Sequence, residues 1–376
     1  MTAKPLNSTL RILRWPGLFI SRMSDADRVA VRSWLWAVAV LVALMVTVGG
    51  ATRLTDSGLS ITEWRPVTGV VPPMSQESWQ EEFLKYQTIP EYQIVNRGMS
   101  LDDFKEIYWW EWGHRFLGRV VGAAFFFPFL YFLIRRKLTR ELGIKLAILF
   151  AAGGFQGALG WFMVQSGLSD RVDVSQYRLA AHLCLAFAII GGLIWVASDL
   201  NESEKREAFI GLEGQRFWAA MFAVLVFFQV FLGAFVAGLR AGYSYNTWPL
   251  MDGGFLPGGY FFLAPWYANF FENAATVQFN HRIVGYLIVL YLAVWCWCMW
   301  NDWPSIWRRC ARIVGLITLA QVGLGIWALV AVVPIWLGLA HQAGALALFS
   351  ASIYLLHLMS SSAVQNRSDC SSSPVG

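Results

Sequence analysis

Residues 313–366 read IVGLITLAQVGLGIWALVAVVPIWLGLAHQAGALALFSASIYLLHLMSSSAVQN and contain no Asp, Glu, Lys or Arg. A helix needs about 20 apolar residues to cross a bilayer, because only intrahelical hydrogen bonds satisfy its backbone there. The stretch is long enough for two such helices, and Val333-Pro334 marks the break between them, since proline lacks the N–H that a helix interior needs. This uncharged run predicts an integral membrane protein.

Six more spans precede this stretch, and five of them are uncharged runs that are each long enough for one membrane-spanning helix. The sixth opens with Arg115 and Arg119 and is apolar from there on. The whole chain of 376 residues is 57% hydrophobic and 14% charged, as expected of a chain that faces lipid. We therefore expect an all-α integral membrane protein with eight transmembrane helices. The six earlier spans are 33–52, 114–134, 146–169, 179–198, 217–239 and 283–301.

Lys and Arg residues in short loops predict the orientation, because cytoplasmic loops carry an excess of them. They gather before the first span, between the second and third spans, and between the sixth and seventh spans. We therefore expect both termini on the cytoplasmic side and loops 53–113 and 240–280 on the outer side. In the first loop, the mixed-charge stretch from Ser75 to Lys105 predicts short helices. The orienting residues are Arg28, Arg32, Arg135, Arg136, Lys137, Arg140, Arg308, Arg309 and Arg312.

The spans divide the chain into two four-helix halves, expected at 33–200 and 201–360, with a cytoplasmic N-terminal segment at 1–32 and a disordered, serine-rich tail at 361–376. The net charge of +5 is not gathered into a basic face with interleaved aromatic residues, which argues against nucleic acid as a partner. The five cysteines form no Cys-x-x-Cys pair and no pair in a polar outer loop. A disulfide framework, a zinc site and covalently attached heme are therefore not expected.

The two halves repeat one another in sequence. HRFLG at 114–118 matches HRIVG at 281–285, and QGALG at 156–160 corresponds to QVGLG at 321–325. The offsets of 167 and 165 residues predict a four-helix unit duplicated in tandem. Because each unit has an even number of helices, both copies start on the same side of the membrane, which gives two pseudo-symmetric bundles in parallel.

Four of the five histidines, His114, His182, His281 and His341, fall at the outer ends of the second, fourth, sixth and eighth spans. An ionisable residue inside a membrane is costly and is a functional candidate by default. A lone histidine is often explained by a hydrogen bond to a neighbouring carbonyl, but four at one depth, two per repeat, indicate metal or proton chemistry. The fifth, His357, lies at the inner end of the last span without a repeat partner, and we expect it to be structural.

Two imidazoles from facing helices suit heme, whose iron takes two axial ligands in an apolar slot, whereas zinc takes a tetrahedral cluster with acidic or thiolate partners. The histidines thus predict two bis-histidine heme sites near the outer surface, one per half. Small residues on the third and seventh spans permit close approach of a flat ring or, equally, ordinary helix packing. These glycines are Gly153, Gly154, Gly157, Gly160, Gly323 and Gly325.

Charged residues flank the histidines. Arginine can pair with heme propionates through bidentate hydrogen bonds, or its side chain can extend to the lipid headgroups. Glu111 lies three residues before His114, on the same helical face, whereas Gln278 stands at the equivalent place of the second half. A carboxylate beside only one heme suggests that one site performs chemistry and the other carries electrons. The candidate propionate contacts are Arg53, Arg115, Arg119 and Arg282.

From about residue 33 to 360 the chain resembles the heme A synthase family. The resemblance rests on four strings: GGATRLTDSGLS with EWRPVTG in residues 49–69, EWGHRFLGR at 111–119, NTWPLM at 246–251 and QFNHR at 278–282. Some members carry a cysteine pair in each outer loop, and this chain has none. It matches the branch with a long first loop that occurs in alphaproteobacteria and mitochondria, so a mechanism that relies on those thiols does not apply.

The resemblance implies an oxidoreductase that acts on a CH or CH2 group. Such an enzyme oxidises the C8 methyl group of heme O to a formyl group by two successive hydroxylations, through a gem-diol that loses water. The product, heme A, serves cytochrome c oxidase. By the same resemblance His281 and His341 ligate the iron of a permanent heme b, His114 and His182 hold the substrate heme, and Glu111 is the catalytic carboxylate.

The resemblance is also compatible with heme O synthase and an electron-transfer protein as partners, and with a homo-oligomer. It favours the bacterial inner membrane over the mitochondrial one. Two other functions compete with it. A bis-histidine cytochrome b that only transfers electrons explains the four histidines but gives Glu111 no role. A transporter explains the tandem repeat but would have a broken helix or a polar cavity near the midplane.

Overall fold

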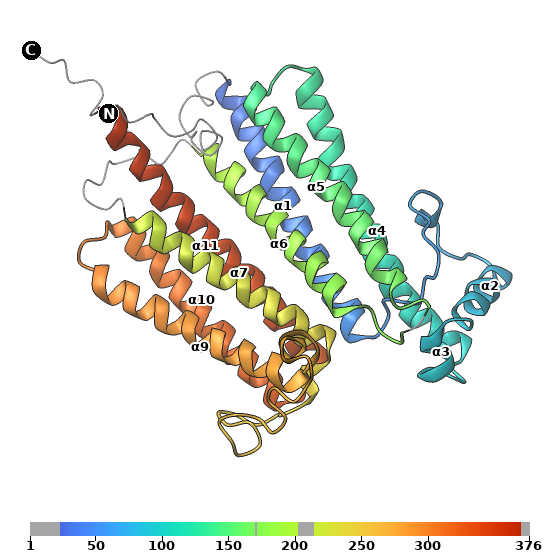
Figure 1. Cartoon of the computed structure of the whole chain (residues 1–376). Coiled ribbons are helices and arrows are strands. Elements are labelled where there is room, and N and C mark those ends of the chain that lie inside the picture. The colour runs from blue at the N-terminus through green and yellow to red at the C-terminus, as the bar shows by residue number, and fades with distance from the viewer. Residues whose placement is uncertain (1–22, 170, 202–213, 370–376) are drawn as a thin grey trace, which may run out of the picture.

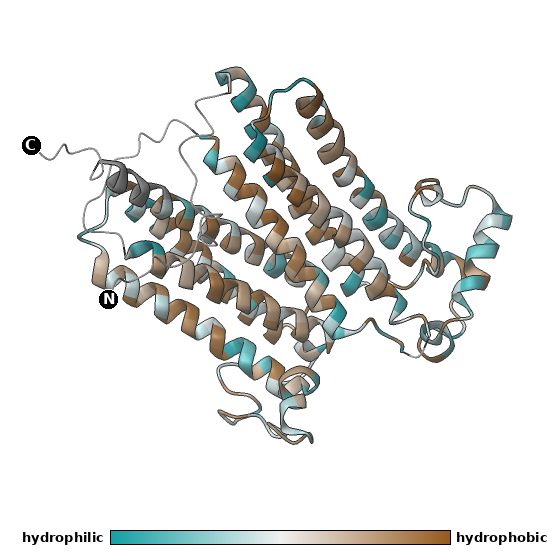
Figure 2. Ribbon diagram, turned by 45° about the horizontal axis from the view of Figure 1, so that its top comes forward, coloured by the Kyte–Doolittle hydropathy of each residue, from teal (hydrophilic) through white to brown (hydrophobic). Residues whose placement is uncertain are grey.

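The computed structural model describes residues 23–169, 171–201 and 214–369 (Figure 1). The regular structure in these residues is helical, apart from an isolated bridge between Met251 and Gly254. Eight of the described helices are long and apolar enough to cross a membrane, which confirms the predicted number. Figure 2 shows hydrophobic residues along these helices. They are α1 (Asp25–Leu54), α4 (Leu101–Ile134), α5 (Arg140–Gln165), α6 (Gln176–Asp199), α7 (Gln215–Gly238), α9 (Ala274–Met299), α10 (Ser305–Val330) and α11 (Ile335–Asp369).

The spanning helices form two groups that lie side by side. Helices α1, α4, α5 and α6 pack together in one group, and α7, α9, α10 and α11 pack together in the other (Figure 1). The groups meet where α6 packs against α7 and α11 and where α1 packs against α11. At this junction the rings of Phe187 and Phe349 lie 5.4 Å apart, centre to centre. The arrangement agrees with two tandem four-helix halves.

The first outer loop is shorter than the predicted 53–113, because α4 begins at Leu101. Ser100 caps this helix: its hydroxyl oxygen accepts a hydrogen bond from the Asp103 amide, and the Asp103 carboxylate accepts one from the backbone N–H of Ser100. Hydropathy placed the boundary where the charges end, whereas the capping residues decide where the helix starts.

This loop contains short helices, as its mixed charge predicts. The rings of Phe83 and Tyr86 both pack on the ring of Phe104, with centres 5.0 and 5.2 Å from it, and they fix the loop on the outer end of α4. In Figure 1 the loop projects beside α4. Its elements are the 3-10 helix η3 (Thr68–Val70), α2 (Gln76–Tyr86) and α3 (Pro90–Ile94).

The second outer loop, predicted to end at residue 280, ends at Asn273, whose side chain caps α9. Asn269 and Asn273 are both buried and hydrogen-bonded to each other, Nδ2 of Asn273 to Oδ1 of Asn269, at 2.9 Å. They hold the loop on the end of α9. Its elements are the 3-10 helices η4 (Ala241–Tyr243) and η5 (Trp266–Ala268) and the short helix α8 (Asn269–Glu272).

The terminal boundaries also differ from the prediction. Helix α1 starts at Asp25, inside the segment predicted as 1–32, and residues 1–22 lie outside the described residues. Helix α11 continues to Asp369, so the predicted boundary at 361 falls inside a helix, and the last seven residues are not described. The chain enters α11 where Val333-Pro334 predicts a break, through two valines with positive φ, 61° at Val332 and 53° at Val333.

His357 lies at the end of the bundle opposite the outer loops and is buried. Its Nε2 atom is 3.0 Å from Oδ1 of Asp199, and Nζ of Lys145 is 2.9 Å from Oδ2 of the same carboxylate. The contacts join α11 of the second half to α5 and α6 of the first. This geometry agrees with the structural role predicted for His357.

Candidate functional site

The four histidines predicted as ligands lie toward one end of the bundle. His182, His281 and His341 are six or seven residues from the outer ends of their helices, about 9–11 Å at 1.5 Å per residue. His114 is thirteen residues into α4, which extends further outward than the other three helices. Each side chain is half-buried, so each imidazole borders open space inside its half.

In the second half, the rings of His281 and His341 face one another, with centres 6.4 Å apart and planes at 77°. Two metal–nitrogen bonds of about 2 Å each, added to the distance from each nitrogen to its ring centre, give a separation of about 6 Å for two imidazoles on opposite sides of one metal ion. The spacing of this pair therefore fits two axial ligands of a heme iron.

Each of the four rings packs with Cε1 against a glycine on the preceding spanning helix. A Cβ atom built on that glycine would lie 2.8–3.3 Å from Cε1, so a larger residue would displace the ring. Sequence reasoning marked Gly160 and Gly325 for close approach, and they contact the imidazoles rather than the flat face of a macrocycle. The pairs are Gly49 with His114, Gly160 with His182, Gly233 with His281, and Gly325 with His341.

Glutamine side chains bind the helical turns that carry three of the four histidines. Gln156, Gln229 and Gln321 each stand four residues before one of these glycines. Each amide donates a hydrogen bond to the backbone carbonyl of the opposite histidine, with nitrogen–oxygen distances of 2.8–3.0 Å. Sequence analysis missed Gln229 and Gly233. The pattern Gln-x-x-Leu-Gly, found at 156 and 321, also occurs at 229–233 and would have revealed them.

The residues present fit a heme in each half. The Nδ1 atoms of all four histidines are buried without a hydrogen-bond partner, while the Nε2 atom of His281 lies 3.3 Å from the side-chain nitrogen of Gln229. Helices α4 and α5, and α9 and α10, are the least closely packed neighbours of their halves. A Cβ atom on Gly153, Gly157 or Gly323 would meet no other heavy atom within 4 Å. An apolar slot lined by small residues and two imidazoles is what heme requires.

Glu111 is buried one turn before His114 and is fully hydrogen-bonded. Its Oε2 atom accepts hydrogen bonds from the Ser60 hydroxyl at 2.8 Å and from the Ile61 backbone N–H at 2.7 Å. Its Oε1 atom accepts two from the Arg115 guanidinium, at 2.5 and 3.0 Å. The carboxylate thus holds the first outer loop against α4.

Gln278 occupies the same place in the second half without a charge. Its amide donates to the carbonyls of Ala241 and Ser244, and its oxygen accepts from Arg282 at 3.1 Å. A neutral amide is therefore sufficient to anchor the second outer loop. The Glu111 carboxylate differs from this amide in its charge and in accepting every hydrogen bond that it makes.

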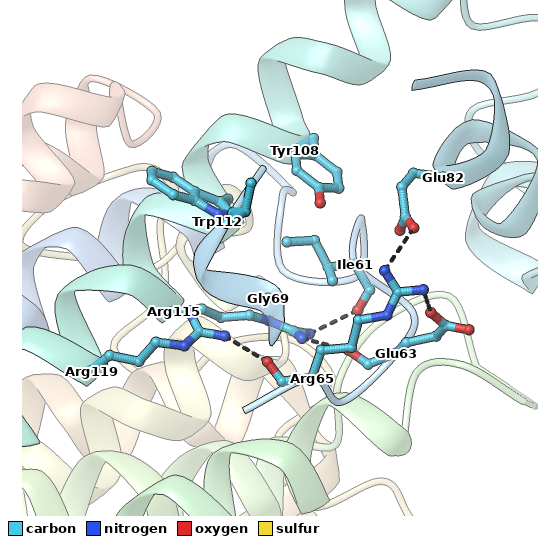
Figure 3. Close-up of a pocket in the computed structure, with 10 residues that line it drawn as sticks. Ile61, Glu63, Arg65, Gly69, Glu82, Tyr108, Trp112, Arg115 and Arg119 are labelled. Atoms are coloured by element: carbon cyan, nitrogen blue, oxygen red, sulfur yellow. Dashed lines mark hydrogen bonds and ion pairs between the residues drawn. The ribbon is translucent and has the colours of Figure 1, made fainter. Parts of the chain in front are cut away.

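The predicted propionate contacts surround the sites, but most of their donors hold the outer loops. Arg115 donates to the carbonyls of Ile61 and Glu63, and Arg119 to those of Arg65 and Pro66. Figure 3 shows both guanidinium groups beside this loop, around a pocket of about 30 Å³. Arg282 likewise donates to the carbonyls of Tyr245 and Thr247. The atoms left buried without a partner are Nη1 of Arg119, Nε of Arg282 and Nε of Arg53.

Arg53 belongs to a four-residue ionic cluster where the halves meet. Its Nη1 atom is 3.0 Å from Asp56 and 3.3 Å from Asp173, and Nη2 donates to the carbonyl of Ala237. Arg240 binds the same two carboxylates at 2.8 and 3.0 Å. Asp56 and Arg240 follow α1 and α7 at matching positions, and both have positive φ, 51° and 53°. The cluster joins the outer ends of α1 and α7.

Residues 32–353 match the model of a family described as cytochrome oxidase assembly protein (COX15-CtaA). The chain belongs to the COX15-CtaA family. The match runs from α1 into α11 and includes all four histidines. Relatives named "Heme A synthase" are found in Parvibaculum lavamentivorans, 54% identical over 89% of this chain and 95% of the relative, and in Nitrosospira multiformis, 52% identical over 86% and 92%. One in Bradyrhizobium diazoefficiens is 49% identical over 89% and 92%.

Proposed function

We propose that this member of the COX15-CtaA family is a heme A synthase, an oxidoreductase that converts a methyl group of heme O to the formyl group of heme A. The observation that carries the proposal is the pairing of the half-buried His281 and His341 rings at 6.4 Å in the second half, with His114 and His182 at the matching positions of the first. The names of relatives with about 50% identity over most of the chain support the same reaction.

Within this proposal the two halves have different tasks. His281 and His341 would hold a permanent heme b, which supplies one-electron transfer when bound. His114 and His182 would hold heme O in the half that also contains Glu111. The slot between α4 and α5 is lined by two helices that are apolar enough to span a membrane and would keep water away from the reacting group.

Glu111 is the proposed catalytic carboxylate. The carbon of a methyl group becomes electron-poor as a hydrogen is removed, and a fixed negative charge stabilises it far better in a water-poor site than in bulk solvent. Four hydrogen bonds from three residues hold the Glu111 carboxylate in place, so little reorganisation is needed when positive charge develops. The carboxylate can also accept a proton. Only the first half has a carboxylate at this place, since the second half has Gln278, and this asymmetry supports a chemical role for the charge of Glu111.

The test removes the charge of Glu111. In Glu111→Gln the amide oxygen can still accept from the Ile61 N–H and the Ser60 hydroxyl, and Arg115 keeps its bonds to the carbonyls of Ile61 and Glu63, so the loop and both hemes should remain in place. The conversion of heme O should fall by roughly 100–1,000-fold, the usual cost of one such electrostatic group. Each variant is expressed in a host that supplies heme O and lacks its own synthase, and the extracted hemes are separated by chromatography. The control, Glu77→Gln, neutralises an exposed acid of the same outer loop and should retain the activity.

The outcomes separate the candidate functions. Heme A formed by the parent chain supports the synthase, and heme O or a hydroxylated intermediate should accumulate with Glu111→Gln. Formation of heme A by Glu111→Gln at the parent's rate would make Glu111 purely structural. Unchanged heme composition with the parent chain, together with a low-spin bis-histidine spectrum, would instead favour an electron-transfer cytochrome b.

We infer the location of the chain from its loop charges and its partners from the reaction. We place the chain in the bacterial inner membrane with both termini cytoplasmic, because the Lys and Arg residues of the short loops lie at the end opposite the two outer loops. A heme O synthase would supply the substrate, and an electron-transfer protein would exchange electrons with the second half. A homo-oligomer is compatible with the exposed apolar faces of the spanning helices.

A further inference from the structure

The four histidine turns are not fixed in the same way. Three of them have their carbonyl tied to the neighbouring helix by Gln156, Gln229 or Gln321. Among the residues that the structure describes, no side-chain amide donates to the carbonyl of His114. The place of the missing glutamine, four residues before Gly49, is taken by Met45.

Contacts with the ligand helices confirm that Met45 and Gln229 hold equivalent places. The Cε atom of Met45 lies 3.3 Å from the position that a Cβ atom of Gly118 would take. The Nε2 atom of Gln229 lies 3.5 Å from the corresponding position at Gly285. Gly118 and Gly285 each follow a ligand histidine by four residues. The same packing place thus holds a hydrogen-bond donor in one half and a thioether in the other.

This difference changes how firmly α4 is held to α1. A glutamine amide next to a backbone carbonyl in an apolar environment makes a directional interhelical hydrogen bond. A methionine offers no donor, and its flexible side chain repacks when its neighbour moves. Within the described part of the chain, the turn that carries His114 is therefore held against α1 by packing, and the hydrogen bond from Trp34 of α1 to the Ala124 carbonyl of α4 lies ten residues further along. The turns of His182, His281 and His341 are also held by a hydrogen bond of their own.

We propose that Met45 is a positioning residue that makes His114 the exchangeable ligand, so that the first half releases its heme while the second half keeps its own. This inference rests on the proposed function, in which the first-half heme is both substrate and product. An enzyme that modifies a heme must let it go after each conversion, and a fourth glutamine at position 45 would slow that release.

The test is a reciprocal exchange, Met45→Gln and Gln229→Met, with Met45→Leu as a control that changes shape without adding a donor. The full-length protein is purified with its hemes and mixed with an excess of apomyoglobin, and heme transfer is followed by absorbance. The parent should lose heme in a fast and a slow phase. Met45→Gln should slow the fast phase about three- to tenfold, as one net hydrogen bond would. Gln229→Met should accelerate the slow phase by a similar factor, and Met45→Leu should leave both phases unchanged.

Unchanged release rates in both exchanged variants would overturn the proposal, as would equal slowing by Met45→Gln and Met45→Leu. If Met45→Gln does not accumulate in the membrane, Gln229→Met decides alone, and an unchanged slow phase refutes the inference. A chain that binds no heme contradicts the proposed function and this inference together. A chain that makes heme A but shows unaltered release in the variants contradicts this inference only.

Discussion

Single glycines determine where the ligand rings lie. In Gly325→Ala the new Cβ atom would lie 2.8 Å from Cε1 of His341, closer than real Cβ atoms approach. The ring must move, and axial ligation tolerates only about 0.5 Å of displacement. We expect this variant to lose most of the low-spin heme absorbance of the second half while the helices remain folded. Absorbance and circular dichroism spectra of the purified protein measure the two effects.

Gly323, two residues earlier on α10, provides the matched control. A Cβ atom there would meet no other heavy atom within 4 Å, so Gly323→Ala should leave the heme spectrum intact. Equal loss of absorbance in both variants would show that helix packing, and not the contact with His341, explains the effect of Gly325→Ala.

Much of the site could be predicted at this scale, because the repeat places chemically matching residues at nearly constant offsets. The four histidines and the asymmetry between Glu111 and Gln278 were found in this way. The partners of Glu111 could not be predicted, since Ser60 and Ile61 lie about fifty residues away in an irregular loop.

At the scale of elements, α3 carries a buried acid that should make the first outer loop sensitive to pH. Burial, above all, raises the pKa of the Glu91 carboxyl to about 8, and the charges of Asp56, Glu111 and Asp173 raise it further, while a hydrogen bond from Tyr86 lowers it. Folding therefore favours the protonated acid. Stability that depends on it is complete below the unfolded pKa of 4.5 and is lost progressively up to pH 8.

We expect the loop between α1 and α4 to open more readily at pH 8 than at pH 5, with a loss of at most about 1.4 kcal/mol per pH unit in between. Limited proteolysis of this loop at several pH values measures the opening. Glu91→Gln cannot ionise and corrects for the pH dependence of the protease itself. If parent and variant gave the same profile, ionisation of Glu91 would not control the loop.

The existence of the long helices was predictable from hydropathy, but their ends were not. Sequence reasoning placed the start of the second span at 114, whereas Ser100 and Asp103 start α4 at residue 101. The sequence contains this capping pair, and a search for capping residues would have found it. Hydropathy missed it because the first three turns of α4 are charged and lie outside the apolar run.

At the scale of the whole molecule, the arrangement of spans predicts opposite locations for two short connections. Lys137 lies in the turn between α4 and α5, and Gly254 lies in the second outer loop, at the other end of the bundle. Reporter fusions at these two residues should report the cytoplasm at Lys137 and the outer side at Gly254. If both fusions reported the same side of the membrane, an eight-helix arrangement would be ruled out.

The division into two halves followed from the repeat, but the contacts between the halves did not. Arg53 stays a predicted propionate contact, and the sequence did not reveal that it also binds Asp56 and Asp173 in the cluster that joins α1 to α7. The tandem repeat predicts that the two copies are similar. It says nothing about the surface along which they meet, because residues there need to match the other copy and not their own equivalents.

Asp56 and Arg240 hold the same place in the two copies yet carry opposite charges, and they bind each other. In a dimer of identical subunits a twofold axis sets each such residue against its own copy, so this contact would oppose two like charges. A separate first half would face aspartate with aspartate, and a separate second half arginine with arginine. Two copies of the same half would therefore repel each other at this contact, whereas the first and second halves attract each other there. The difference in charge at this one position favours pairing of the two unlike halves.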